Sequence, residues 1–160
     1  HLVIHLGDFD YGDDPEAWDK LTNQVLGENF PLFAVVGNHD TDAWDGYQQK
    51  LQARLERVEG AQCTGALGTK SACTYRGLFF ILSGAGTLET GHDEFITDAL
   101  SADDHIWRVC SWHKNQGDMQ PGYRPNEVGW GPYEACGQNR AVIATAHEHS
   151  YARTLTLTDM

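Results

Sequence analysis

The chain has 160 residues, 41% hydrophobic and 11% aromatic, which excludes a disordered protein and suits one folded domain. Its formal net charge is −12, with 23 acidic and 11 basic residues. Such an acidic surface repels phosphate backbones, so we expect no nucleic-acid partner. No apolar run is long enough to span a bilayer, so we also expect no membrane insertion.

Apolar runs and amphipathic stretches alternate along the chain, and this order predicts an α/β fold. Buried strands are expected at residues 2–6, 32–36, 78–82, 106–110 and 141–146. Helices are expected from Pro15 to a stop at Gly27, with Asp14 as the N-cap, and at residues 43–58 and 92–100. A loop or hairpin should occupy residues 60–76. Residues 111–139 are expected to form a long loop beside the functional site.

The two ends of the chain resemble strands cut short. Residue 1 already lies in an apolar run without an initiator Met, and residues 155–160 also have a strand pattern. We therefore expect an incomplete domain, truncated at both ends and lacking its first strand. A larger protein or assembly would supply that strand.

The four cysteines allow three pairings. Cys63 and Cys73 flank a Gly/Thr-rich stretch that suits a closed loop, which leaves Cys110 to pair with Cys136. Four buried free thiols are the alternative. The even number in local pairs favours disulfides and an oxidising compartment, so we expect an extracellular or secretory-pathway protein.

Four of the predicted strands run into polar motifs. The motifs are Gly7-Asp8, Gly37-Asn38-His39-Asp40, His113, and His147-Glu148-His149. Because ligands in open α/β sheets gather beyond the carboxyl ends of strands, these side chains should meet in one place. Carboxylate, amide and imidazole groups together are a set of metal ligands. Each residue alone also has an ordinary structural reading, as a turn, cap or core residue.

In order and approximate spacing, the motifs resemble those of the calcineurin-like metallophosphoesterases over nearly the whole chain. Gly37-Asn38-His39-Asp40 is the most specific piece, and the terminal His-x-His is the second. Tyr11, three residues after Asp8, and Tyr151, two residues after the last His, are similar to the purple acid phosphatase branch. The resemblance implies an αββα sandwich, and residues 1–160 would form a single, incomplete catalytic domain of that type.

The resemblance also implies two metal ions, bridged by the Asp8 carboxylate. It divides the other ligands into two sets: Asn38, His113 and His147 for one ion, and His149, with Tyr11 if the purple branch applies, for the other. Iron, zinc or manganese would suit these ligands, and the metal identity stays open.

The resemblance implies that the protein hydrolyses phosphate esters. Phosphomonoesters are the expected substrates. A metal-bound hydroxide would attack, and His39 would serve as acid or phosphate-binding group, oriented by Asp40. The substrate could instead be a phosphodiester or a nucleotide, because the motif set is shared across these classes.

The chain departs from the family pattern in ways that keep another class of function open. No Asp-x-His or Asp-x-Gly motif precedes His1, Ala146 stands where Gly is usual, and His113 lies one residue further from its Val than in the purple branch. The alternative is a non-catalytic structural or binding module that keeps the fold within a larger assembly.

Overall fold

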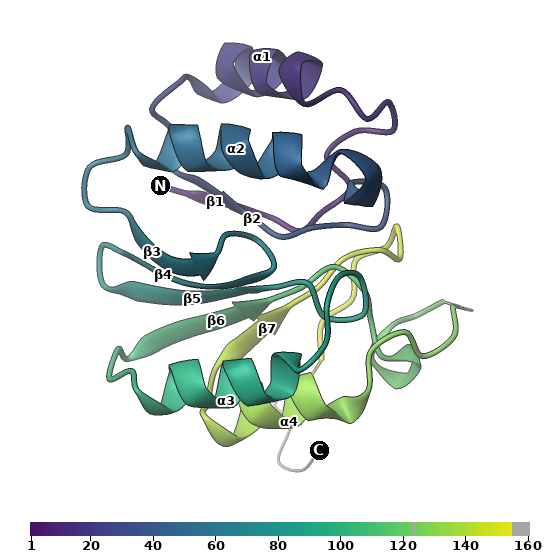
Figure 1. Ribbon diagram of the computed structural model, residues 1–160. Coiled ribbons are helices and arrows are strands. Elements are labelled where there is room, and N and C mark those ends of the chain that lie inside the picture. Colours follow the sequence, from purple (N-terminus) through teal and green to yellow (C-terminus); the bar gives the residue numbers. More distant parts are fainter. Residues whose placement is uncertain (123, 155–160) are drawn as a thin grey trace.

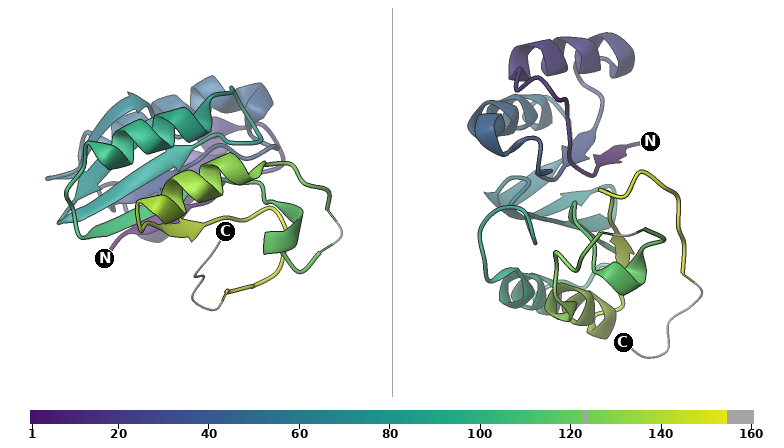
Figure 2. Two further views of the ribbon diagram at one scale, coloured as in Figure 1. Left: turned by 90° about the horizontal axis from the view of Figure 1, so that it is seen from below. Right: turned by 90° about the vertical axis from the view of Figure 1, so that its right-hand side faces the viewer.

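A computed structural model describes residues 1–122 and 124–154. In this part of the chain, two β-sheets lie face to face between two pairs of helices (Figure 1). Figure 2 shows the helix pairs on opposite outer sides of the sheets. The helices are α1 (Pro15–Leu26), α2 (Trp44–Leu55), α3 (His92–Ser101) and α4 (Trp130–Gln138), with short 3-10 turns η1 (Thr41–Ala43) and η2 (Gly117–Met119). This is a mixed α/β architecture, in agreement with the predicted fold class.

The smaller sheet pairs β1 (Val3–His5) in parallel with β2 (Leu32–Ala34). The larger sheet has the order β3-β4-β5-β6-β7, in which the first three strands are antiparallel and the last three are parallel. Its strands are β3 (Gln62–Ala66), β4 (Lys70–Tyr75), β5 (Leu78–Ser83), β6 (Trp107–Ser111) and β7 (Val142–Ala144).

Strand β5 separates the two hydrophobic cores of the molecule. Successive side chains of a strand point to opposite faces, and here both faces are covered. Phe80 and Leu82 pack into the core that reaches the smaller sheet, where the Phe80 ring centroid lies 4.9 Å from that of Phe33. Phe79 and Ile81 pack into the core under α3 and α4. Burial on both sides explains the continuous apolar run of this strand.

The first helix has the ends that its sequence predicts. The Asp14 side chain accepts the Ala17 N–H at 3.0 Å, and Pro15 occupies the first helical position. Gly27 ends the helix at φ 94°, a backbone region that L side chains rarely adopt.

Two sequence predictions are corrected by the structure. Residues 111–139 are not a continuous loop, because they contain η2 and α4. The helix was not predicted because Gly131, Pro132 and Gly137 have low helix propensity. Pro132 is nevertheless tolerated because it lies in the first turn, where a missing N–H breaks no intrahelical bond. The strand predicted through residue 146 ends at Ala144, so His147 and His149 follow the strand rather than extend it. The strand expected at residues 155–160 lies outside the described residues.

Both predicted disulfides are present. Cys63–Cys73 joins directly opposed residues of β3 and β4, and Cys110–Cys136 ties β6 to α4. These bonds are compatible with a secreted protein.

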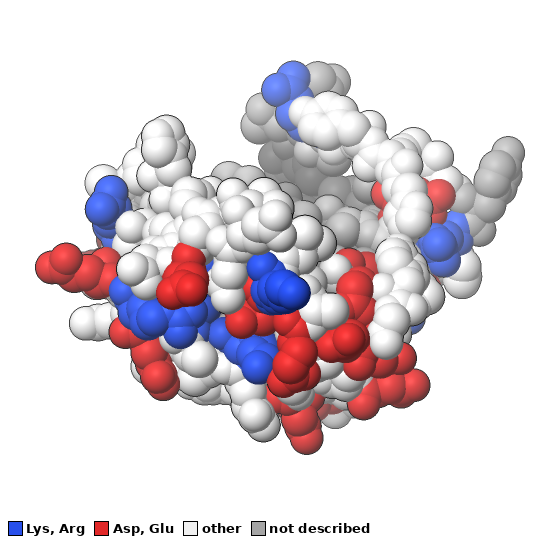
Figure 3. Space-filling view, turned by 90° about the horizontal axis from the view of Figure 1, so that it is seen from above, with Lys and Arg blue, Asp and Glu red and all other residues white. Residues whose placement is uncertain are grey.

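Charges of both signs are interspersed on the outer face formed by α1 and α2 (Figure 3). Lys50 on α2 lies 2.9 Å from Glu16 on α1, which links the two helices across this face. Among the described helices, none combines the length and apolar character required to cross a membrane.

Candidate metal centre

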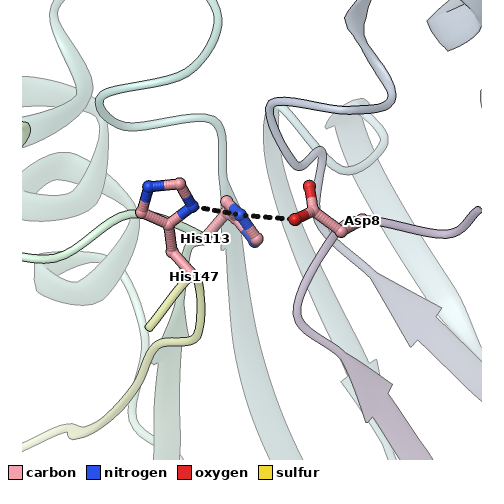
Figure 4. A group of neighbouring side chains, drawn as sticks. All are labelled: Asp8, His113 and His147. Carbon is pink, nitrogen blue, oxygen red and sulfur yellow. Dashed lines mark hydrogen bonds and ion pairs between the residues drawn. The ribbon is translucent and has the colours of Figure 1, made fainter. Parts of the chain in front are cut away.

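Three side chains from distant parts of the sequence converge at one edge of the sheets (Figure 4). Asp8, His113 and His147 follow β1, β6 and β7, and each offers one ligand atom within 4.8 Å of the others. Asn38, which follows β2, joins them with its Oδ1 atom 3.1 Å from His113 Nε2. Four predicted metal ligands are therefore gathered, as expected for side chains beyond the carboxyl ends of strands.

Two glycines allow the turns after β1 and β2 to approach each other closely. A Cβ atom on Gly7, which has φ 89°, would lie 2.6 Å from Gly37 Cα and 2.7 Å from His113 Nδ1. A Cβ atom on Gly37 would collide with the backbone nitrogen of Asp8. Asp8 itself has φ 56°, a conformation more accessible to Asp than to most residues. The Gly-Asp and Gly-Asn motifs thus have a steric reason as well as a chemical one.

The Asp40 carboxylate joins these two turns. It is buried and accepts backbone N–H groups from Asp8 at 2.9 Å, Phe9 at 2.7 Å and Gly37 at 2.7 Å. Burial raises the pKa of Asp40, and the three N–H donors partly offset that effect. Through these bonds Asp40 holds the backbone beneath Asp8 and Asn38.

Backbone contact also determines the hydrogen position on His113. Its Nδ1 donates to the Leu6 carbonyl at 2.6 Å, which leaves the Nε2 lone pair facing the cluster. Around Nε2 lie Asp8 Oδ2 at 3.3 Å, Asn38 Oδ1 at 3.1 Å and His147 Nδ1 at 3.0 Å. Burial lowers the pKa of both histidines, so both rings favour the neutral form that metals require.

This donor set fits a metal ion. Two oxygens and two ring nitrogens lie close enough together to coordinate one cation, once both nitrogens present their lone pairs to it. The mixture of carboxylate, amide and imidazole ligands suits iron, zinc or manganese.

The remaining predicted site residues lie outside this cluster. The His39 side chain is exposed, although its backbone N–H donates to Asp8 Oδ1 at 3.1 Å. Tyr11 is 66% exposed, and its ring centroid lies 4.5 Å from that of His39. His149 is exposed, and His147 has φ 65°, so the chain turns between the two histidines. Ala146 keeps negative φ and fits where the family pattern has Gly.

The sequence did not predict a group of residues that contact His147 or its neighbours from the side away from the cluster. Glu127 Oε2 lies 2.9 Å from His147 Nε2, and its Oε1 lies 2.8 Å from Lys114 Nζ. Buried Asn115 donates from Nδ2 to the Ala146 carbonyl at 2.6 Å. Lys114 and Asn115 directly follow His113, so their position in the sequence could have indicated that they lie near the site. Glu127 lies 20 residues before His147 and stands in no motif.

A second group of acidic residues and histidine, at Asp103, Asp104 and His105, has a structural explanation. Asp103 binds Arg108 Nε at 2.9 Å and His105 Nδ1 at 2.6 Å. These partners use both carboxylate oxygens of Asp103 in a local network at the start of β6.

Two sheets between helix layers, with Asp, Asn and His side chains gathered at converging strand ends, define an α/β protein with a candidate metal site. The calcineurin-like phosphoesterase family profile matches residues 1–151. The chain belongs to this family, and family membership implies metal-dependent hydrolysis of phosphoesters in general. The match gives no support for the purple acid phosphatase branch in particular. A search of curated proteins found no match.

Proposed function

We propose that the protein hydrolyses phosphomonoesters at a centre of two metal ions. The observation that carries this proposal is the convergence of Asp8, Asn38, His113 and His147, whose candidate ligand atoms lie close together at one point. Carboxylate, amide and imidazole groups gathered in this way suit a metal ion.

These four side chains would hold one ion. Asp8 would also help to hold a second ion, together with His149 and Tyr11. When bound, the ions would neutralise charge on the phosphoryl oxygens and lower the pKa of a water molecule.

His39 is proposed as the group that protonates the leaving oxygen or binds the phosphate. Its backbone N–H is held by Asp8 Oδ1, so its position is tied to the cluster, while its ring stays accessible. Asp40 would orient His39 indirectly, since it fixes the backbone of the turn that carries it. A proton supplied at this point assists departure of an alkoxide.

The test combines metal content with turnover in purified protein. Asn38→Ala and His147→Ala should each lose bound metal and hydrolysis of a nitrophenyl phosphate monoester. Full activity in either variant would contradict the proposal. Faster hydrolysis of the bis(nitrophenyl) ester than of the monoester would move the substrate class to phosphodiesters.

Exposure of Tyr11, His39 and His149 favours one alternative, a binding module with a single occupied metal site or none. Elemental analysis separates the two functions. Two metal equivalents per chain with phosphatase activity support the enzyme, whereas one or none without turnover supports the module. A visible charge-transfer band in iron-loaded protein that is lost in Tyr11→Phe would support the purple branch.

Secretion is part of the same proposal. Both disulfides connect structured elements, β3 to β4 and β6 to α4, which is the usage expected in an oxidising compartment. Non-reducing peptide mapping of the native protein tests it, because fully reduced cysteines in the native source would contradict secretion.

A further inference from the structure

The geometry points to Glu127 as a positioning residue that holds His147 in the ring orientation and tautomer needed for metal binding. The inference deepens the proposed function and rests on it for the identity of His147 as a ligand. Glu127 reaches the site from the segment between η2 and α4, far from the motifs that carry the ligands.

The two ring nitrogens of His147 face different partners. Nδ1 lies 3.0 Å from His113 Nε2 and faces the cluster, whereas Nε2 lies 2.9 Å from Glu127 Oε2. Nε2 is buried, and Glu127 is the one partner the described residues offer it, at an ion-pair distance outside hydrogen-bond geometry. A carboxylate beside Nε2 stabilises the form of the ring with a hydrogen on that atom, which is the form whose Nδ1 lone pair can bind a metal.

Glu127 is itself held in place on two sides. Its Oε1 pairs with Lys114 Nζ at 2.8 Å, and its backbone N–H donates to the Asn115 carbonyl at 3.3 Å. The group facing His147 is therefore a fixed carboxylate, with its side chain 23% exposed.

The two histidine ligands are oriented by different means. A backbone carbonyl at Leu6 fixes His113, so no single side-chain substitution removes that contact. A side chain fixes His147, and His147 also sits at φ 65° beyond the end of its strand, where no ladder bonds restrain it. Loss of Glu127 should therefore release one ligand while leaving the other three in place.

Metal affinity is the first readout. We expect Glu127→Ala to weaken Zn²⁺ or Mn²⁺ binding by about 10- to 100-fold in calorimetric titration, the usual effect of removing the partner of a ligand histidine. Glu127→Gln keeps the shape and an acceptor oxygen, so its loss should be smaller. Glu148→Gln is the matched control, because it removes the same charge next to His147 from a carboxylate that pairs with Arg124 instead.

The second readout needs no metal. Two-bond ¹H–¹⁵N correlation spectra of the metal-free protein should show the same share of the Nε2–H form of His147 in the wild type and in Glu148→Gln. In Glu127→Ala the spectra should show a larger share of the Nδ1–H form, while thermal unfolding confirms that the variant is folded.

The two readouts separate the inference from the proposed function. Unchanged metal affinity together with an unchanged His147 tautomer in Glu127→Ala would overturn the inference. If the wild type binds no metal, the proposed function fails, and the tautomer alone decides the role of Glu127.

Discussion

The two halves of the candidate site are built in contrasting ways. Asp8, Asn38, His113 and His147 are brought together by four strand ends and restrained by partly buried hydrogen bonds. The proposed outer half, with Tyr11, His39 and His149, lies on exposed chain. The fold itself therefore preorganises the inner half, whereas the outer half has few tertiary restraints.

Removing an inner ligand should have the largest effect. His147→Ala should lose all bound metal and reduce turnover by more than about 100-fold, beyond the usual effect of losing a residue that only supports a ligand. His149→Ala should still bind one equivalent, because the inner ligands remain. Elemental analysis measures the bound metal in both variants. Equal metal loss in both would show that the two halves do not differ in this way.

Asp40 tests how much stability the inner half contributes. Asp40→Ala removes the acceptor of three backbone N–H groups, and each buried donor without a partner costs about 1–3 kcal/mol. We expect a loss of about 4 kcal/mol in the free energy of unfolding, measured by urea denaturation. Exposed Asp42→Ala is the control and should change it by less than about 0.5 kcal/mol. A small loss in Asp40→Ala would show that the turns hold without their carboxylate.

The Cys63–Cys73 bridge tests whether stability and metal binding can be separated. It lies in the β3–β4 hairpin, and chain-entropy arguments give about 3 kcal/mol for a sequence separation of 10. Replacing both cysteines by Ala should lower the free energy of unfolding by that amount and leave metal content unchanged. Loss of metal at temperatures where the variant is folded would show that the hairpin supports the site.

His92 is a buried histidine that is not a candidate metal ligand, so it shows what burial alone does to the pH dependence of stability. Its expected effect is the smallest of the four. It is buried outside the cluster, where Nε2 donates to the Leu88 carbonyl at 2.8 Å and Nδ1 accepts the Ser83 hydroxyl at 3.0 Å. Burial lowers the pKa of His92 below 6.5. The unfolded chain then binds more protons in acid, so the folded state loses stability as pH falls below about 6.5.

We expect His92→Gln to be less stable than the wild type by about 1 kcal/mol at pH 7, through weaker hydrogen bonding. The difference should shrink as pH falls towards 5. Denaturation of metal-free protein at several pH values measures it, with exposed His1→Gln as control. A difference that is constant with pH would show that His92 titrates alike in both states.

Local patterns predicted much of the fold. Apolar runs located β1, β2, β5, β6 and β7, whereas residues 60–76, expected as a loop or hairpin, contain β3 and β4. Asp14, Pro15 and Gly27 bounded the first helix, and cysteine spacing indicated both disulfides. α4 was missed because glycine and proline dominate its local signal, while its burial against α3 and β6 stabilises it.

The sequence by itself determined which residue types stand at each strand end, because those motifs are contiguous and carry their own chemistry. Only the tertiary structure placed Asp8, Asn38, His113 and His147 in contact and left His149 exposed. It also decided the roles of Asp40, Glu127 and the Leu6 carbonyl. The physical reason is that these groups act across long sequence separations, through distances and burial that no local pattern records.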